Sequence, residues 1–244
     1  MIILAIKRST AKKTRIVDII HGKFFPGNKE EMKPSYIITP FGEKLSRVNL
    51  IATATEKFLS EDENYSAITV DDGTAAIRFK TFRDDIRILD GIEVGDLVLV
   101  IGKVKEYNSE IYINGEIVRK LDNPNFENLR KLEILQKLVK LKAIAEEIKN
   151  LSNELSEEEL KSYAKEKNID DESLQVILDS KKIEIDYKPK ILGLIESLDD
   201  GDGVEIGKIM ELSQLPENVI ESAINELLNS GTLYEPTVGK LKKV

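Results

Sequence analysis

The sequence has 244 residues but no cysteine, no tryptophan and only one histidine, His21. The lack of cysteine excludes disulfides, thiolate metal sites and cysteine nucleophiles. A single histidine does not by itself provide a zinc site or a Ser-His-Asp triad. No apolar run approaches the ~20 residues of a membrane-spanning helix. We therefore expect a protein that needs no metal or cofactor and makes no contact with a membrane.

The net charge is −8, and it is unevenly distributed. Residues 1–46 carry nine Lys or Arg and four Asp or Glu, whereas residues 47–119 carry nine and fourteen. Because phosphate neutralisation supplies most of the affinity of nonspecific polyanion binders, the total charge argues against a strong one but allows a local basic strip. The first residues, MIILAIKRST, place their positive charges after a very short apolar run. This is unlike a secretory signal and predicts a cytoplasmic protein.

The segment from Arg47 to Arg119 has the pattern of a small β domain. Five stretches of alternating or β-branched residues are separated by turn signals, among them the Asp-Gly turn of VDDGT. A helical candidate, RDDIRILDGI, lies between the third and fourth stretches. Five short strands with one helix in that place favour a five-stranded Greek-key OB-fold barrel, and another small β-barrel stays the alternative.

Two of the predicted strands each place an aromatic residue in step with two cations. In TAAIRFKTF, the alternation directs Ile77 and Phe79 inward and leaves Arg78, Lys80 and Phe82 on the other face. In LVLVIGKVKEY, Lys103, Lys105 and Tyr107 share a face, so we expect two adjacent strand ends that each offer an aromatic residue in phase with two cations. Bases stack on aromatic rings for ~1–3 kcal/mol each and cations follow the backbone, so this pattern is typical of single-strand binders.

The alternative is that Phe82 and Tyr107 only close the ends of the barrel and that the cations are ordinary solvated side chains. We favour the binding interpretation. The candidate DNA-binding residues are Phe82, Tyr107, Arg78, Lys80, Lys103, Lys105, Lys57 and Arg83.

A long helix is predicted over residues 123–151, with Asn123 as N-cap and Pro124 at the first helical position. Apolar residues recur on it at spacings of 4, 3, 4 and 3, and a second apolar stripe lies beside them. The first stripe is Ile134, Leu138, Leu141, Ala145 and Ile148, and the second is Leu132, Leu135 and Val139. Two stripes suit a three-helix bundle with partner chains, and packing on the chain's own barrel is the alternative left open.

The C-terminal third predicts a helical, acidic linker and then a small domain. In the linker, Ser156 and Glu159 have the spacing of a capping box. From Lys188 onward, three helices precede a hairpin, which is the pattern of a winged helix. The third helix, PENVIESAINELLN, has three Glu and no Lys or Arg. Because base readout starts from phosphate neutralisation, we expect this domain to dock proteins.

No catalytic constellation is present, so we expect no enzymatic activity. The Asp pairs at 71–72, 84–85 and 199–200 lie in predicted turns or helix starts, where Asp shapes the turn or caps the helix. A nucleotidyl transferase with an OB domain would need a Lys-based nucleophile motif, and none is found.

Several stretches resemble the middle subunit of archaeal replication protein A. These are YIITPFGEKLSRV, DENYSAITVDDGTAAIRFKTFRDD and GDLVLVIGKVKEYNSEIYI, and the end, LLNSGTLYEPTVGKLKKV, resembles that family's winged helix. The resemblance implies a nucleoid-associated heterotrimer that binds single-stranded DNA in replication, repair and recombination. It also implies that bases stack on Phe82 and Tyr107. The absence of Trp, which the family often has at one of these positions, and the net acidic barrel imply a modest share of the affinity.

In that family the helix after the barrel joins a three-helix core with the large and small subunits, which favours the bundle, and the winged helix recruits replication or repair proteins. The alternative function is a scaffold, or a telomere-cap-like accessory subunit, that makes no significant DNA contact. The predicted fold is α+β: a basic N-terminal arm, an OB-fold barrel, an assembly helix, a helical linker and a winged helix. These segments cover residues 1–46, 47–121, 123–151, 152–187 and 188–244, respectively.

Overall fold

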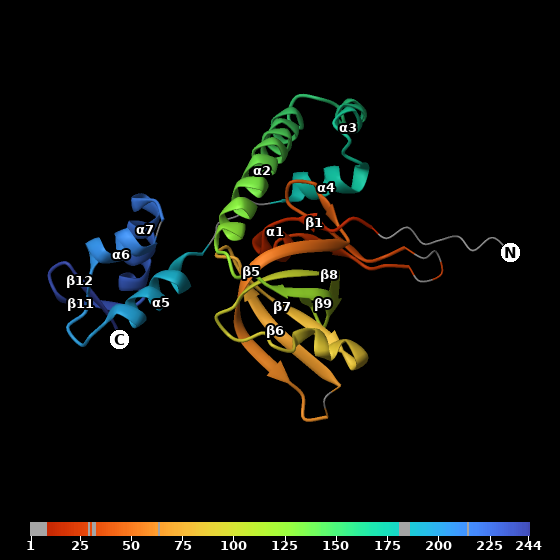
Figure 1. Ribbon diagram of the computed structural model, residues 1–244. Coiled ribbons are helices and arrows are strands. Elements are labelled where there is room, and N and C mark those ends of the chain that lie inside the picture. Colours follow the sequence, from red (N-terminus) through yellow and green to blue (C-terminus); the bar gives the residue numbers. More distant parts are fainter. Residues whose placement is uncertain (1–8, 29, 31–32, 63, 181–185, 214) are drawn as a thin grey trace. The chain divides into compact units, whose positions relative to one another are not determined.

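The computed structural model describes residues 9–28, 30, 33–62, 64–180, 186–213 and 215–244. The chain forms two compact units, residues 1–183 and 184–244 (Figure 1). The strands of the first unit are β1 (Lys12–Lys13), β2 (Lys23–Phe25), β3 (Tyr36–Ile38), β4 (Lys44–Leu45), β5 (Arg47–Leu59), β6 (Tyr65–Asp71), β7 (Ala76–Phe82), β8 (Leu97–Tyr107) and β9 (Glu110–Lys120). Its helices are α1 (Ile16–Ile20), the 3₁₀ helix η1 (Arg83–Leu89), α2 (Asn125–Leu151), α3 (Glu157–Glu166) and α4 (Asp171–Asp179).

The five long strands of the first unit pair in a ring. β5 pairs antiparallel with both β6 and β8, β6 with β7, and β8 with β9, while β7 and β9 pair in parallel. The pairing order therefore runs from β5 through β6, β7, β9 and β8 and returns to β5. The strands and the intervening η1 lie where the alternation and turn signals of the sequence predict them.

The inner face of this ring forms the core of the unit. Phe79, Ile113 and Val104 are fully buried there, in phase with the inward positions expected from the alternation. Gly115 faces Phe79, and a Cβ at Gly115 would overlap the Phe79 ring. Burial of one such large apolar side chain stabilises the fold by roughly 1.5–3 kcal/mol.

One irregularity in β5 decides which of its side chains reach the outer face. The pairing steps from Ala54 opposite Val70 to Glu56 opposite Thr69, so Thr55 is a bulge. A bulge adds one residue to one strand and thereby reverses the phase of the residues after it. Glu56 and, two residues on, Phe58 consequently join the outer face.

The described part of the N-terminal segment, residues 9–46, packs onto the ring of strands. β1 pairs in parallel with β5, and β2, β3 and β4 form a small separate sheet. The RIVDII stretch, which is ambiguous in sequence, forms α1, and its Ile16 and Ile19 are buried in the core.

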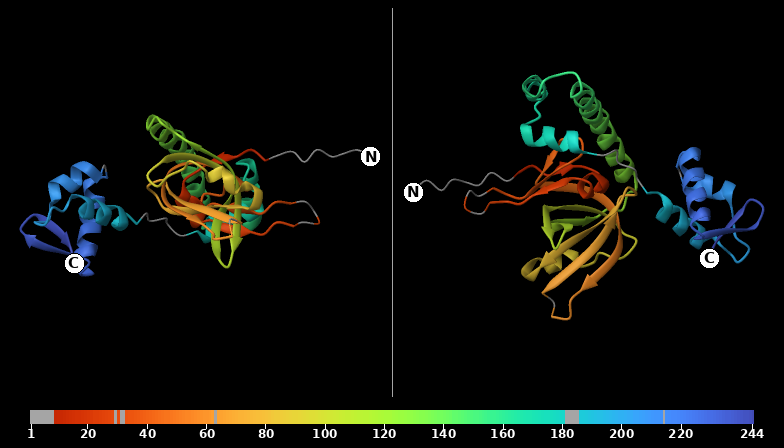
Figure 2. Two further views of the ribbon diagram at one scale, coloured as in Figure 1. Left: turned by 60° about the horizontal axis from the view of Figure 1, so that its bottom comes forward. Right: turned by 180° about the vertical axis from the view of Figure 1, so that it is seen from behind.

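Helices α2, α3 and α4 share a second apolar cluster of the first unit. Ile148 and Ile177 are fully buried in it, together with Leu160 and Ala164. In Figure 1 and Figure 2, α2 rises away from the strands and α4 returns toward them. The segment interpreted as a linker thus has a core of its own through residue 179, and its predicted capping box at Ser156 and Glu159 is present.

The described residues of the second unit form three helices followed by a hairpin, as expected, and a short strand that was not expected precedes the second helix. Its helices are α5 (Lys188–Leu198), α6 (Ile206–Ser213) and α7 (Glu217–Asn229), and its strands are β10 (Val204–Glu205), β11 (Leu233–Thr237) and β12 (Lys240–Lys243). The strand order is β10-β12-β11. Ile191, Ile209, Ile220 and Leu241 are fully buried at its centre.

Among the described residues, no helix combines the length and the apolar composition needed to cross a bilayer.

Candidate nucleic-acid interface

Three aromatic rings form a continuous row across the outer face of β5, β6 and β7. Tyr65 lies opposite Phe82 in the ladder, with ring centroids 5.4 Å apart, and Phe58 lies 5.7 Å from Tyr65 on the other side. Phe58 and Phe82 are 56% and 41% exposed. A row of exposed rings on adjacent strands can stack successive bases. Phe58, Tyr65 and Phe82 are called the aromatic row below.

Tyr107 does not belong to this row. It is opposite Glu110, and the parallel pairing of Phe79 with Ile113 puts Glu110 level with Ala76, at the start of β7. Phe82 is at the other end of β7, six residues or about 20 Å away at ~3.3 Å per residue. The sequence-based picture of two neighbouring strand ends is therefore wrong, because β9 inserts between β7 and β8 and runs parallel to β7.

Four predicted cations do lie on one outer face. Lys103 pairs with Asn114 and Lys105 with Tyr112 in the β8–β9 ladder, and β9 adjoins β7 with Arg78 and Lys80. Arg78, Lys103 and Lys105 are accessible, with the side chains of Arg78 and Lys103 more than half exposed. The structure thus places the cations of β7 and those of β8 on one face, with β9 between the two strands.

Lys80 lies on the outer face, where the sequence predicts a contact with the DNA backbone, but it is buried. Its side chain is 10% exposed, and its Nζ lies 4.5 Å from the centroid of the Tyr112 ring. The same Nζ donates to Glu110 Oε2 at 2.9 Å. The ammonium group thus lies between the Tyr112 ring and the Glu110 carboxylate.

An open hollow of about 480 Å³ lies on this face. It is lined by Glu56, Thr69, Ala76, Ile77, Arg78, Glu110 and Ile111. Its volume is within the range of small-molecule sites. Glu56 and Glu110 oppose Arg78 in it, so the hollow is not basic overall.

Two predicted contact residues lie elsewhere. After the bulge, Lys57 is on the side of β5 opposite Phe58, and its Nζ donates to the Ile92 carbonyl at 2.8 Å. Arg83 follows Phe82 directly at a positive φ of 52° and begins η1, with its side chain exposed. Lys57 therefore ties β5 to the loop after η1, while Arg83 remains beside the aromatic row.

The loop before Tyr65 is ordered by one carboxylate. Asp62 accepts hydrogen bonds from the Ser60 hydroxyl at 2.6 Å and from the Asn64 backbone N–H at 3.2 Å. These hydrogen bonds lower the pKa of Asp62 to about 2, and the bond from the Ser60 hydroxyl has the largest effect. The Ser60 N–H in turn donates to the Tyr65 carbonyl, so the loop fixes the end of the aromatic row.

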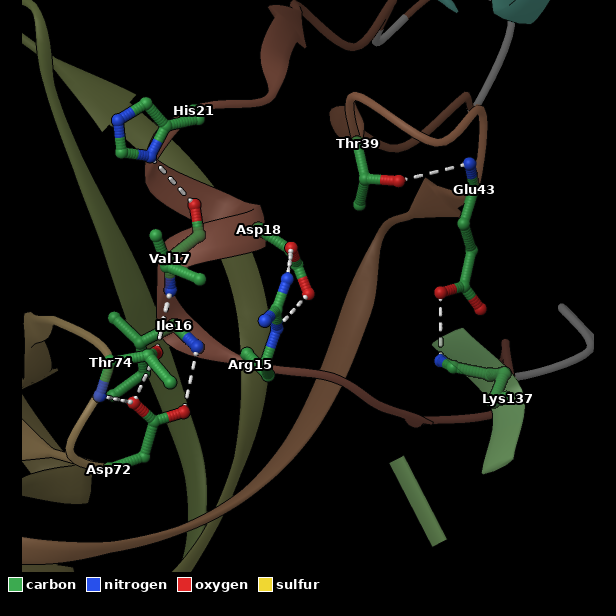
Figure 3. A network of polar contacts seen from close by, with 10 residues as sticks. All are labelled: Arg15, Ile16, Val17, Asp18, His21, Thr39, Glu43, Asp72, Thr74 and Lys137. Carbon is green, nitrogen blue, oxygen red and sulfur yellow. Dashed lines mark hydrogen bonds and ion pairs between the residues drawn. The ribbon is translucent and has the colours of Figure 1, made fainter. Parts of the chain in front are cut away.

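The Asp-Gly turn between β6 and β7 holds α1, as Figure 3 shows. Asp72 accepts from the Ile16 N–H at 2.9 Å and from the Thr74 hydroxyl at 2.6 Å, and Thr74 accepts from the Val17 N–H at 3.2 Å. Burial raises the pKa of Asp72 despite these bonds. Asp72 thus shapes a turn and caps a helix, as expected of an Asp there, but the helix is 56 residues away.

Much of the apolar stripe predicted for subunit assembly is buried within the chain. Ile134, Ala145 and Ile148 are buried, and Leu138 and Leu141 are partly buried. Near the start of α2, Arg130 also donates to the Asn49 carbonyl at 2.7 Å and thereby fastens the helix to β5. Farther along α2, Ala145 and Ile148 share an apolar cluster with Leu160 of α3 and Ile177 of α4.

The second stripe of α2 is the exposed one. The exposed fractions of Leu132, Leu135 and Val139 are 64%, 56% and 62%, and Leu129 continues the stripe toward the N-terminal end of the helix. Leu129, Leu132, Leu135 and Val139 are called the α2 stripe below.

In the second unit, the charges follow the sequence expectation. Glu217, Glu221 and Glu226 are exposed along α7. Two cations of the hairpin contact carboxylates of the same unit, since Lys242 faces Asp199 at 3.9 Å and Lys243 pairs with Glu196. Within the described residues, no cluster of three or more His, Asp or Glu side chains is arranged to hold a metal ion.

Phe58 and Tyr65 were missed in the sequence for different reasons. The bulge in β5 reverses the phase of Phe58, and no feature of the alternation reveals it. Tyr65 could have been found by counting outward from the Asp-Gly turn, because hairpin register follows from the turn and puts Tyr65 opposite Phe82.

Comparison with known proteins identifies the ring of strands. Residues 52–121 match a family model described as an OB-fold nucleic acid binding domain. This confirms the OB fold expected for that segment.

One curated relative and two solved structures are also similar. An uncharacterised protein of Methanocaldococcus jannaschii is 35% identical over 151 residues, which are 62% of this chain and 58% of that protein. A chain of a replication protein A heterotrimer bound to single-stranded DNA is 19% identical, with a TM-score of 0.45. The similarity covers 55% of this chain and 98% of that one. A chain of the S. pombe Stn1–Ten1 complex is 18% identical, with a TM-score of 0.48, and the similarity covers 56% of this chain and 96% of that one. The chain thus matches somewhat over half the length of its curated relative.

Proposed function

We propose that this chain is a non-enzymatic subunit of a replication protein A-like assembly and that its closed OB barrel binds single-stranded DNA. The observation that carries the proposal is the aromatic row beside Arg78 on the outer face of a domain that matches an OB-fold nucleic acid binding model. Rings would stack bases, and the cations of β7 and β8 would contact phosphates. Single strands suit this face because their bases are free to stack.

The binding path would run from the aromatic row across β7 and β9 toward Lys105 and Tyr107. It covers about 20 Å of strand length, which suits a few nucleotides at the short end of OB-fold site sizes, ~4–16 nucleotides. Several cations on this path already have carboxylate partners, as Arg78 has Glu110 and Lys103 has Glu116. We therefore expect modest affinity and a shallow salt dependence.

The test is a titration of the full chain with a fluorescent oligothymidylate of about 12 nucleotides at two salt concentrations. Binding that weakens with salt, and that competes with unlabelled single strands but not with duplex, supports the proposal. An absence of binding in both salts, with the chain folded, favours the scaffold alternative.

We further propose that the α2 stripe, and not the buried stripe of the same helix, contacts the large and small subunits. Four large apolar side chains with exposed fractions above one half are unusual in a row on a helix that is already anchored on its other side. Co-purification with candidate partner subunits tests this. Loss of the complex on Leu132→Asp with Val139→Asp, in a chain that stays folded, is the expected result.

The second unit is proposed to be a winged helix that recruits replication or repair proteins. The acidic exposed edge of α7 supports a protein partner over DNA, because it would repel phosphates. Replacing Glu217 and Glu221 by Gln in the full chain should therefore leave the affinity for oligonucleotides unchanged.

A further inference from the structure

Two cations of the outer face hold one carboxylate between them. Glu110 Oε2 lies 2.9 Å from Lys80 Nζ, and Glu110 Oε1 lies 3.4 Å from Arg78 Nη1. Glu110 is the first residue of β9 and follows the tight turn at Asn108 and Ser109. The two carboxylate oxygens of Glu110 thus each face a cation. The non-bridging oxygens of a phosphate contact basic side chains in the same way.

Lys80 has little freedom to choose another partner. It lies between Ala67 and Asn114 in the sheet, its side chain is 10% exposed, and its Nζ lies over the Tyr112 ring. A buried ammonium group needs an anion or other acceptors nearby, since leaving it unpaired is costly. The position beside Lys80 Nζ is therefore one where a negative charge is required, whichever group carries it.

This position lies on the proposed path of the strand. Arg78 and Glu110 line the open hollow, and Arg78 lies opposite Thr69 on β6, the strand that begins with Tyr65. A strand whose bases stack on the aromatic row would bring its backbone past Arg78. The side chain of Glu110 is 40% exposed, so it can turn away into solvent.

We infer that Arg78 and Lys80 form a phosphate subsite for single-stranded DNA, which the Glu110 carboxylate occupies in the free protein and leaves when the strand binds. This inference rests on the proposed function. Glu110 then acts as an internal competitor that lowers affinity and salt dependence while it keeps Lys80 paired.

Glu110→Gln tests the inference, with Glu56→Gln as the matched control. Both substitutions remove one negative charge from the same hollow, but Glu56 accepts a hydrogen bond from the Thr69 hydroxyl and forms no ion pair with any of the described residues. Binding of oligothymidylate by the full chain is measured over a salt series. Glu110→Gln should bind roughly three- to fivefold more tightly at low salt, because the strand no longer has to displace a carboxylate from Arg78, whose ion pair with Glu110 is solvent-exposed. The slope of log K against log salt should steepen by about 0.7 for one added phosphate contact.

Glu56→Gln should change the affinity by less than about twofold and leave the slope unchanged. The gain in affinity from Glu110→Gln should be smaller in a chain that also carries Arg78→Ala. The subsite is contradicted if Glu110→Gln and Glu56→Gln gain affinity equally. It is also contradicted if the wild type binds and Glu110→Gln gains no affinity. Neither result contradicts the proposed function. If the wild type and both variants bind no oligonucleotide, the proposed function fails and the inference with it.

Discussion

Tyr65 and Phe82 face each other across β6 and β7, with their rings 5.4 Å apart and tilted by 40°. Phe58 extends the contact to a third strand. Offset or tilted aromatic neighbours stabilise each other by about 0.5–1.5 kcal/mol beyond their burial. The three rings thus hold one another in place while each keeps an exposed surface, which is the arrangement that base stacking needs.

A first prediction concerns how the aromatic substitutions combine. Phe82→Ala and Tyr107→Ala together should weaken binding of short single strands by ~1–3 kcal/mol. Because the two residues are about 20 Å apart along β7, their separate effects should add, whereas those of Tyr65→Ala and Phe82→Ala should not. The measurement is a double-mutant cycle on oligonucleotide affinity. Coupling between Phe82 and Tyr107 as large as between Tyr65 and Phe82 would contradict the geometry.

A second prediction concerns the Asp-Gly turn. Asp72→Ala removes the acceptor for Ile16 N–H and for two donors of Thr74, and should lower the free energy of unfolding by roughly 1–3 kcal/mol. Asp72→Asn should lower it as well, because both carboxylate oxygens accept and an amide offers one oxygen. Urea unfolding followed by NMR signals of the first unit checks this. Unchanged stability in both variants would show that α1 is held by packing alone.

A third prediction separates the two stripes of α2. Ile148→Asp buries a charge among Leu160, Ala164 and Ile177 and should destabilise the first unit by several kcal/mol. Leu132→Asp is on the exposed stripe and should change the free energy of unfolding by less than about 0.5 kcal/mol. Thermal unfolding of both full-length variants measures the difference. Comparable losses would mean that the α2 stripe is also covered within the chain.

A fourth prediction is a pH dependence of the loop before Tyr65. The pKa of Asp62 is lowered to about 2 in the folded protein, against 3.8 for an ordinary Asp. The hydrogen bonds of Asp62 therefore stabilise the fold fully above about pH 4, and this contribution is lost as the pH falls toward 2. An NMR titration of the Asp62 carboxyl carbon measures it, and Ser60→Ala should move the midpoint upward. A wild-type midpoint near 3.8 would show that the loop is not held in this way.

The strands were predictable from sequence because their inner faces alternate so regularly. Ile77 and Phe79 are buried as expected, and the Asn108–Ser109 turn joins β8 and β9. The cyclic pairing, with β9 beside β7, is a non-local property. It places Tyr107 of β8 level with the start of β7, whereas Phe82 is at the end of β7. Local alternation cannot supply it.

The assembly stripe shows a different limit. A spacing of 4, 3, 4 and 3 predicts that one face of a helix is buried, but it does not say which chain buries it. Ile148 meets Leu160 and Ile177 of the same chain, from helices that the sequence suggests only as an acidic connector. Lys80 was placed correctly on the outer face, yet its burial depends on the Tyr112 ring of another strand.

Binding of single-stranded DNA by the aromatic row can be tested with one affinity measurement on the full chain. Phe58→Ala, Tyr65→Ala and Phe82→Ala are combined and compared with Tyr234→Ala, which removes a similarly exposed ring from the second unit. We expect at least a tenfold loss of oligothymidylate affinity for the triple variant, since stacking is worth ~1–3 kcal/mol per base, and no loss for the control. A folded triple variant that binds as tightly as the wild type would contradict this role of the aromatic row.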